Sequence, residues 1–519
     1  MEVSMRFALV SVSDKTGVDV LGRGLVELGF TILSTGGTAK ALLAAGVEVT
    51  KVSEHTGASE VFGGRVKSLH PKIHGGILGR RGTDDAEAAA NDIGWIDLVA
   101  CNLYPFEATI SKAGVGLAEA VENIDIGGPS MVRSAAKNHA DVAVVVDPSD
   151  YELVLEALRS DSLDGELRRR LAVKAFRHTA AYDGLISTWL AEQAGIADMA
   201  EGGIPLRRLQ ALPKGENGHQ RASFYVQPGA TGRSLARVEQ LQGKDMSFNN
   251  WADLDATLRC AFEFDEAPAC VIVKHMNPCG VGLHSDGPAR AFELALSGDP
   301  ISAFGGIVAF NRPLSADDVR TIRKARTMFE IVAAPGFSDE ALALFAPRKN
   351  LRVMRLPEDW AGSRPSGMDG RRVQGGWLLQ DWDLGAEIAW NVATKAKPTD
   401  EQVRALQFAW KVVRNVKSNA IVLARTEDGG CVLNGTGAGQ MSRVDSVKLS
   451  IVKATRPIPG SVLASDAFFP FPDGVQAAAE AGVTAIIQPG GSKKDGEVIA
   501  AADAAGVAMV LTGARHFRH

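Results

Sequence analysis

Short apolar runs alternate with amphipathic stretches along the first 150 residues of the chain. The run Phe7–Val12 has the length and composition of a buried strand, and the residues that follow it place apolar side chains at helical spacing. The predicted helical face consists of Val18, Leu21, Leu25 and Leu28. Further strands are predicted at Phe30–Leu33, Val47–Val52, Ile96–Cys101 and Val142–Val146. Alternating strands and helices are typical of a parallel sheet, which binds ligands at the carboxyl ends of its strands.

The second half of the chain again mixes apolar runs with helical patterns. A polar, helical stretch over residues 150–200 ends at the break Gly202–Pro205, so we place a boundary near residue 200. This gives a first domain over residues 1–200 and a second over 201–519, large enough for two subdomains. We expect an exposed loop at Ala361–Arg372. Strands are expected at Cys270–Lys274, Gly306–Phe310, Ala420–Ala424, Ala485–Gln488 and Val507–Leu511.

Composition narrows the class of protein. A length of 519 residues exceeds what one hydrophobic core usually serves. The net charge of −5 and the aromatic fraction of 6% argue against a nucleic-acid partner. The five cysteines are scattered and odd in number, which favours reduced thiols. We find neither a signal peptide nor an apolar run long enough for a membrane, and therefore expect a cytoplasmic protein.

Two turns after predicted strands carry small hydroxylic residues and glycines, at Ser11–Gly17 and Ser34–Thr38. In a parallel sheet both would lie at one edge, where helix N-termini attract anions, and Lys15 would add a positive charge. Helix capping explains either turn alone. Both turns together make phosphate binding and capping about equally good explanations.

A basic, glycine-flanked segment follows at Gly63–Gly76. It could be a solvated loop, but such a loop in an acidic protein fits an anionic substrate better. Further on, Pro129 could open a helix that places Lys137 two turns in, facing Asp125 across a cleft. That carboxylate–ammonium pair could move protons, although periodicity alone favours a structural ion pair.

The motifs SVSDKTG, STGGTAK, GGRVKSLHPKIHGGIL, CNLYPF and ENIDIGGPSMVRSAAKNH occur in order over residues 5–190. Together they resemble the IMP cyclohydrolase domain of the bifunctional purine-biosynthesis family, whose fold is similar to methylglyoxal synthase. The resemblance implies ring closure of formyl-AICAR without a metal or redox cofactor. Residues implied to surround the ring-closing atoms are Lys67, Tyr104, Asp125 and Lys137. Residues implied to bind the ribose and phosphate are Ser11, Ser13, Lys15, Ser34, Thr35, Gly36, Gly37, Arg65 and Ser68.

Lys274 and His275 end an apolar strand that runs into a turn containing Pro278 and Gly280. A histidine can take a proton from an attacking amine while an adjacent lysine stabilises an oxyanion. Taken alone, the pair is more often two polar residues leaving a strand. Cys279 lacks the second cysteine of a deaminase zinc motif, so a zinc site is not expected.

The motifs VIVKHMNPCGVG, DPISAFGGIVAF, KSNAIVLA, GTGAGQMSRVDSV, SDAFFPFPDGV, AIIQPGGS and RHFRH resemble the AICAR transformylase domain of the same family over residues 205–519. The resemblance implies two cytidine-deaminase-like α/β subdomains without zinc, nucleotide and folate substrates, 10-formyltetrahydrofolate as formyl donor, and a homodimer. It implies Lys274 and His275 as the catalytic pair. Residues implied to bind the two substrates are Asn419, Asp466, Phe468, Arg515, Phe517, His519, Phe304, Gly305 and Val444.

One segment departs from the family pattern L-R-Y-G-E-N-P-H-Q. The arginine position holds Pro213, the tyrosine position Lys214, and the internal proline position Gly218. Loss of an arginine–phosphate contact removes ~1.5–3 kcal/mol of binding, or ~10–100-fold in affinity. We therefore expect a weakened AICAR site. Two alternatives to the two-activity enzyme are a nucleotide-sensing first domain and an active cyclohydrolase beside a weakened transformylase.

Overall fold

The computed structural model describes residues 6–196, 201–385 and 388–519, and these form two compact units. Unit 1 comprises the chain up to Arg207 together with Val226–Gly229, and unit 2 comprises Arg208–Tyr225 and Ala230–His519. The boundary predicted near residue 200 adjoins residues 197–200, which lie outside the described residues. The assignment of domains 1–200 and 201–519 remains a prediction.

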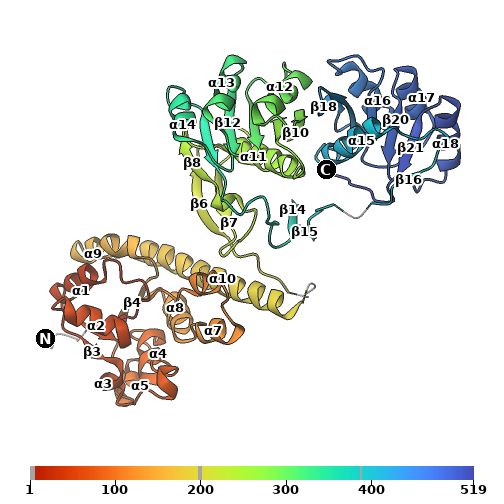
Figure 1. Ribbon diagram of the computed structural model, residues 1–519. Helices are drawn as coiled ribbons and strands as arrows, with labels where there is room; N and C mark the ends of the chain where they lie inside the picture. Colours follow the sequence, from red (N-terminus) through yellow and green to blue (C-terminus); the bar gives the residue numbers. More distant parts are fainter. Residues whose placement is uncertain (1–5, 197–200, 386–387) are drawn as a thin grey trace. The chain divides into compact units, whose positions relative to one another are not determined.

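Unit 1 is built on a five-stranded sheet in the order β3-β2-β1-β4-β5, with every neighbouring pair parallel (Figure 1). The predicted parallel sheet is therefore confirmed. The strand predicted at Val47–Val52 is shorter, because the Val47 amide donates to the carbonyl of Leu42 (3.0 Å) and closes the preceding helix. The strands are β1 (Arg6–Val10), β2 (Phe30–Ser34), β3 (Thr50–Lys51), β4 (Ile96–Ala100) and β5 (Ala143–Val145).

Helices cover this sheet because their apolar stripes face it, as Val18, Leu21 and Leu25 do from α1. The longest helix, α10, packs against α8 and β5 and begins where the Asp164 carboxylate accepts the Leu167 amide (2.8 Å). The helices are α1 (Val18–Glu27), α2 (Gly36–Ala44), α3 (Val52–Thr56), α4 (Pro71–Leu78), α5 (Asp85–Ala90), α6 (Phe106–Ile110), α7 (Leu117–Glu122), α8 (Gly127–Lys137), α9 (Tyr151–Arg159) and α10 (Gly165–Ala194).

Unit 2 contains a twelve-stranded sheet made of two similar halves. Its order is β16-β21-β20-β19-β17-β18-β10-β9-β11-β12-β13-β8, and the β10–β18 pair joins the halves at its centre. Each half begins with a short strand, continues with a helix and an antiparallel hairpin, and ends with alternating helices and strands. The first strand of each half, β8 or β16, pairs antiparallel with the last. This repeat agrees with the two α/β subdomains predicted from the sequence.

The strands of the first half are β8 (Glu239–Gln242), β9 (Ala269–Lys274), β10 (Asn277–Leu283), β11 (Gly306–Phe310), β12 (Phe329–Ala334) and β13 (Arg352–Arg355). Those of the second half are β16 (Asn391–Val392), β17 (Ile421–Glu427), β18 (Gly430–Gly437), β19 (Val462–Ser465), β20 (Ala485–Gln488) and β21 (Ala508–Leu511). Period-two alternation sends Val271 and Val273 of β9 to one face and Ile272 to the other.

Three groups of helices cover the unit-2 sheet. The leading helices of the two halves, α11 (Phe248–Ala261) and α15 (Asp400–Val413), share one continuous core on one face. The opposite face is divided into two cores, one under each half. These cores are covered by α12 (Pro288–Gly298), α13 (Ala316–Lys324) and α14 (Asp339–Phe345), and by α16 (Arg443–Val452), α17 (Asp473–Glu480) and α18 (Asp495–Ala504).

The prediction of a loop at Ala361–Arg372 is wrong for its last residues. Its last residues form β14 (Asp369–Val373), which pairs antiparallel with β15 (Gly376–Gln380). The two-residue connection places Gly375 at φ 78°, a conformation that glycine adopts without a steric penalty. A second small hairpin, β6 (Arg207–Leu212) with β7 (Ala222–Val226), lies where the chain passes between the units.

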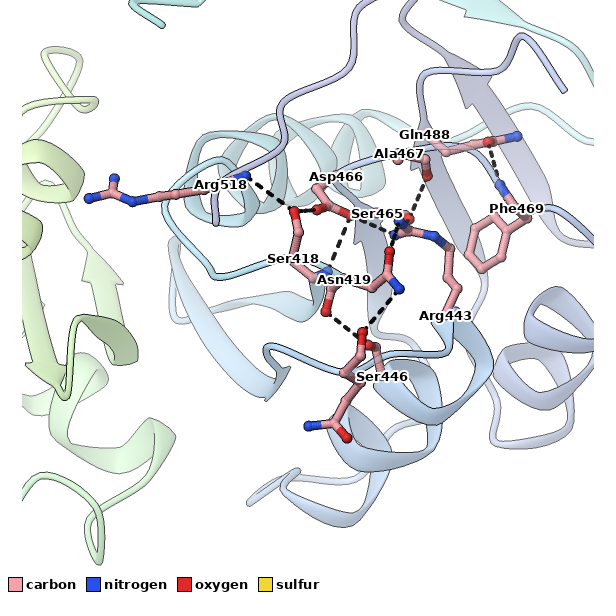
Figure 2. A network of polar contacts seen from close by, with 12 residues as sticks. Ser418, Asn419, Arg443, Ser446, Ser465, Asp466, Ala467, Phe469, Gln488 and Arg518 are labelled. Carbon is pink, nitrogen blue, oxygen red and sulfur yellow. Dashed lines mark hydrogen bonds and ion pairs between the residues drawn. The ribbon is translucent and has the colours of Figure 1, made fainter. Parts of the chain in front are cut away.

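A buried polar network connects β19, α16 and the C-terminal segment of unit 2 (Figure 2). The Asp466 carboxylate, which is fully buried, pairs with Arg443 (2.5 Å) and accepts the Ala420 amide (3.2 Å) and the Ser418 hydroxyl. The same arginine donates to the side-chain oxygen of Asn419 (2.7 Å). Each buried charge therefore has a charged partner and further hydrogen bonds, as burial requires.

We predict that Asp466→Ala destabilises unit 2 by ~3–5 kcal/mol, because it leaves the Arg443 guanidinium buried without a counter-charge. The measurement is urea unfolding of the full chain followed by tryptophan fluorescence. The control is Lys494→Ala, which removes an exposed pair with Glu497 and should shift stability by no more than ~1 kcal/mol. Equal, small shifts in both variants would contradict the prediction.

Candidate active sites

The carboxyl edge of the unit-1 sheet is hollowed into a pocket of about 570 Å³. Its walls come from the segments that follow β1, β2 and β4, from the glycine-flanked basic segment, and from the start of α8. Convergence at this edge is what a parallel sheet predicts. The sequence-predicted residues that line the pocket are Ser11, Ser13, Lys15, Thr35, Gly36, Gly37, Arg65, Lys67, Ser68, Tyr104 and Asp125.

The N-terminus of α2 forms the cationic end of this pocket. The Lys67 ammonium lies 3.7 Å from where a β-carbon on Gly36 would stand, and the Lys15 ammonium lies 3.7 Å from the same position on Gly37. Two lysine ammonium groups therefore lie beside the first residues of the helix. Free backbone N–H groups, the helix dipole and two ammonium groups at one point can hold a phosphate.

Two buried side chains fix the loop after β1. The Asn102 side-chain oxygen accepts the amides of Ser13 (2.6 Å) and Asp14 (2.9 Å), while its nitrogen donates to the Asp14 carbonyl (3.0 Å). Thr38 accepts the Val12 amide (3.0 Å) and donates its hydroxyl to the Val12 carbonyl (2.8 Å). The loop is thus held by hydrogen bonds from two neighbouring elements.

Carboxylates accompany the two cations of the basic segment. Arg65 donates from Nε to Glu122 (3.2 Å) and pairs with the same carboxylate through its Nη2. Lys67 lies 3.7 Å from a carboxylate oxygen of Glu60. Glu122 also lines the pocket, so both signs of charge are present in its wall.

Asp125 lies half-buried where the chain enters α8. Its carboxylate accepts the amides of Gly128 (2.8 Å) and Tyr104 (3.4 Å). Burial raises the pKa of Asp125, and these two amides oppose that shift only in part. A carboxyl group with a raised pKa in a pocket is suited to proton transfer. The backbone of Asp125 is fixed as well, since its amide donates to the Tyr182 hydroxyl (2.8 Å).

Two predicted residues of unit 1 lie elsewhere. Ser34 is fully buried and donates its hydroxyl to the carbonyl of Val10 (2.6 Å), inside the sheet. Lys137 is exposed and is the last residue of α8, which has 11 residues. The first turn of α8 lines the pocket, so Lys137 lies roughly 15 Å along the helix from it. The predicted helix start at Pro129 is also wrong, because α8 begins at Gly127. Within the described chain, Lys137 does not face Asp125.

In unit 2 the catalytic pair suggested by the sequence occupies a tight β-hairpin. Lys274 pairs with Asn277, and the two residues between them form the turn with φ 52° for His275 and 61° for Met276. A two-residue connection with two positive φ angles matches the twist of the flanking strands. The turn leaves His275 exposed, while Lys274 donates to the carbonyl of Gly305 (3.0 Å).

Hydrogen bonds join this hairpin to the motif that contains Asn419. The Asn277 side-chain oxygen accepts the Lys417 amide (3.0 Å), and its nitrogen donates to the His275 carbonyl (3.1 Å). Two residues further, the Asn419 nitrogen donates to the carbonyls of Gln440 (3.0 Å) and Met441 (3.1 Å). The structure thus brings the KHMN and KSN motifs, far apart in sequence, into contact.

The C-terminal residues are fixed beside the same motif. Lys417 donates to the His519 carbonyl (2.6 Å), and the Ser418 amide donates to the Arg518 carbonyl (2.8 Å). Arg515 stacks over Phe517 at 4.5 Å, and Phe517 lies 5.5 Å from the His519 ring. These contacts fix the segment that follows the apolar strand β21.

The remaining predicted residues occupy different environments. Phe304 is 59% exposed and precedes Gly305, while Val444 stands in the first turn of α16. Phe468 is half-buried, whereas Asp466 is fully buried in the network of Figure 2. The buried Asp466 side chain therefore has no exposed surface that could contact a ligand. It positions Asn419 indirectly, through Arg443.

Sequence reasoning missed three polar residues of these sites. Asn102 and Arg443 stand within motifs that were noted, CNLYPF and GTGAGQMSRVDSV, but only the hydrogen bonds reveal that they position neighbouring residues. Glu122 likewise begins the motif ENIDIGGPSMVRSAAKNH, but only the folded chain shows that it contacts Arg65. Long-range pairing of this kind is absent from local sequence patterns.

The segment that departs from the family pattern lies between β6 and β7, where Pro213 and Lys214 are exposed. All five cysteines are free. Among the described residues, no cluster of three or more His, Cys, Asp or Glu side chains could hold a metal ion. The described helices are all too short or too polar to cross a membrane.

Comparison with known families adds independent findings. The model of the AICARFT/IMPCHase bienzyme family matches residues 135–453, more than half of the chain, and the model of the MGS-like domain matches residues 18–130. The chain is also similar to a solved structure entitled "Crystal structure of ForH", with 37% identity, coverage of 36% of this chain and 99% of that chain, and a TM-score of 0.32.

The two family matches confirm the resemblance found in the sequence, with the MGS-like domain corresponding to the parallel sheet of unit 1. They favour two activities over the alternative in which the transformylase is weakened. The chain therefore belongs to the AICARFT/IMPCHase bienzyme family and catalyses the last two steps of IMP synthesis, formyl transfer to AICAR and dehydrative ring closure of formyl-AICAR.

Proposed function

We propose that the pocket of unit 1 is the cyclohydrolase site and that the Lys274–Asn277 hairpin of unit 2 is the centre of the transformylase site. The observation that carries the first assignment is the convergence of two lysines, the start of α2 and a carboxyl group with a raised pKa on one pocket. The second rests on the contact between the hairpin and the Lys417–Asn419 motif.

In the cyclohydrolase site, Lys15 and the first amides of α2 hold the nucleotide phosphate. This orients formyl-AICAR so that its carboxamide nitrogen attacks its own formyl carbon. A carbon–nitrogen bond forms, and the formyl oxygen leaves as water with one hydrogen from the carboxamide and one from the formamide nitrogen. Lys67 stabilises the negative charge that develops on the formyl oxygen, and Asp125 accepts the proton from the attacking nitrogen.

In the transformylase site, the amine of AICAR attacks the formyl carbon of 10-formyltetrahydrofolate. The new nitrogen–carbon bond replaces the bond to N10 of the folate, which gains a proton as the amine loses one. His275 takes the amine proton, and Lys274 stabilises the oxyanion of the tetrahedral intermediate. Asn419 holds the AICAR carboxamide and Phe304 contacts the folate.

We further propose that both substrates bind to a homodimer in the cytoplasm, as the family resemblance implies. The family uses nucleotide and folate substrates. Lys137 and Ser34 remain predicted site residues.

Asp125→Asn should lower kcat for ring closure by ~10²–10⁴-fold, because an amide cannot accept the proton. The assay follows conversion of formyl-AICAR to IMP by ultraviolet absorbance. Asp19→Asn, which alters an exposed carboxylate on α1, is the matched control and should leave kcat unchanged. Retention of more than a tenth of wild-type kcat in Asp125→Asn would contradict this role.

The pH dependence of ring closure follows from the environment of Asp125. Its base form exists only above its pKa, which burial raises, so activity should fall as the pH is lowered through that raised value. The acid limb of kcat/KM should therefore lie above the ordinary carboxyl range of ~4. A profile that stays flat down to that range would exclude Asp125 as the base.

His275→Ala should lower kcat for formyl transfer by ~10²–10⁴-fold and leave ring closure at the wild-type rate, since the two sites use different residues. Release of tetrahydrofolate from 10-formyltetrahydrofolate measures the first reaction. Lys494→Ala, which removes an exposed side chain of unit 2 that pairs with Glu497, serves as the control. Unchanged formyl transfer in His275→Ala would show that another group takes the proton.

A further inference from the structure

The catalytic turn of unit 2 has a backbone conformation that its own sequence does not favour. His275 and Met276 both have positive φ angles, at 52° and 61°, and neither is glycine, asparagine or aspartate. A side chain in this region costs roughly 1–2 kcal/mol per residue. Contacts outside the turn must therefore hold it.

One such contact comes from a helix on the adjacent face of the sheet. A carboxylate oxygen of Asp253, in the middle of α11, accepts the amide of Met276 at 2.8 Å. Asp253 is half-buried, and burial raises its pKa, while Lys274, His275 and the turn amides act in the opposite direction. The Asp253 carboxylate thus contacts the backbone of the turn that carries the predicted catalytic pair.

The helix that carries Asp253 is rigidly anchored. Ser247 caps its start by accepting the Asn250 amide (3.2 Å), and the Asn250 side chain accepts the Ser247 amide in return (3.1 Å). Leu254 and Leu258 are buried in the core that α11 shares with α15. A carboxylate on such an element fixes its hydrogen-bond partner more precisely than one on a loop.

The opposite side of the turn is held independently. Asn277 donates to the His275 carbonyl (3.1 Å) and accepts the Lys417 amide (3.0 Å). The His275 carbonyl and the Met276 amide belong to one peptide group, so Asn277 and Asp253 hold that group at its two ends. The imidazole then projects from a turn whose central peptide group is held by two different elements.

We propose that Asp253 is a positioning residue for formyl transfer, which holds the His275–Met276 turn so that the imidazole and the Lys274 ammonium meet the reacting amine. It contacts neither substrate. The proposal rests on the proposed role of His275 and adds a residue that acts through it.

The test compares Asp253→Ala, which removes the acceptor, with Asp253→Asn, which keeps an oxygen able to accept the Met276 amide. Since misplacement of a catalytic group by about 1 Å can cost ~10²-fold, Asp253→Ala should lower kcat for formyl transfer by ~30–100-fold. KM values for AICAR and 10-formyltetrahydrofolate should change less than ~3-fold, which also shows that unit 2 is folded. Asp253→Asn should recover most of kcat.

Asp318→Asn is the matched control, because Asp318 is also a carboxylate of unit 2 that accepts backbone amides, those of Ala289 (2.9 Å) and Ser315 (2.8 Å). It should leave kcat for formyl transfer unchanged. The proposal is overturned if Asp253→Ala keeps kcat within ~3-fold, if only its KM values rise, or if Asp253→Asn is as slow as the alanine variant. Failure of the catalytic role itself has a different signature, namely unchanged formyl transfer in His275→Ala.

Discussion

The ion pair between Arg443 and Asp466 is the interaction on which the second half of unit 2 depends. The Asp466 carboxylate is fully buried, so its charge is stable only because a guanidinium, a hydroxyl and an amide surround it. Through Arg443 the pair fixes Asn419, and through Ser418 it fixes the backbone of Arg518. A single buried charge pair thus sets the positions of a candidate substrate-binding amide and of the C-terminal segment.

In unit 1 the backbone of the site is positioned by neutral side chains instead of a charge pair. Asn102 and Thr38 hold the loop after β1 through five hydrogen bonds in total, and neither carries a charge. This leaves Lys15 and Lys67 as the groups that set the electrostatic potential near the start of α2. Neutral side chains position this loop without adding a further negative charge beside the anion site.

Much of the fold followed from sequence patterns. Apolar runs such as Ile96–Cys101 and Gly306–Phe310 correspond to strands, and the glycine turn after Phe30–Leu33 opens a helix as predicted. The predicted element boundaries were wrong at two kinds of place. At Val47 the backbone amide bonds to the preceding helix instead of a strand, and at Asp369–Val373 a short hairpin replaces part of the predicted loop. The spacing of apolar residues indicates which face of an element is buried, but it does not indicate which carbonyl a given backbone amide will bond to.

The sites were predictable only in part, for a related reason. Motif residues such as Lys15, Lys67 and Asp125 do line one pocket, because the carboxyl ends of parallel strands must converge. By contrast, Asn102 holds the Ser13 amide in unit 1 and Arg443 holds the Asn419 side chain in unit 2, over sequence separations of 89 and 24 residues. Such contacts exist only once the chain is folded, and periodicity cannot encode them.

The pairing of cations in unit 1 determines where binding energy for a nucleotide arises. Arg65 already contacts Glu122 and Lys67 lies near Glu60, so a phosphate that engaged either cation would exchange one ion pair for another. Such an exchange yields little net free energy, since exposed pairs contribute only ~0–1 kcal/mol. Lys15, by contrast, donates to the neutral carbonyls of Val12 (3.4 Å) and Ser13 (3.2 Å). A neutral carbonyl gives up an ammonium group more readily than a carboxylate does. The affinity for phosphate therefore comes mainly from Lys15 and the amides of α2.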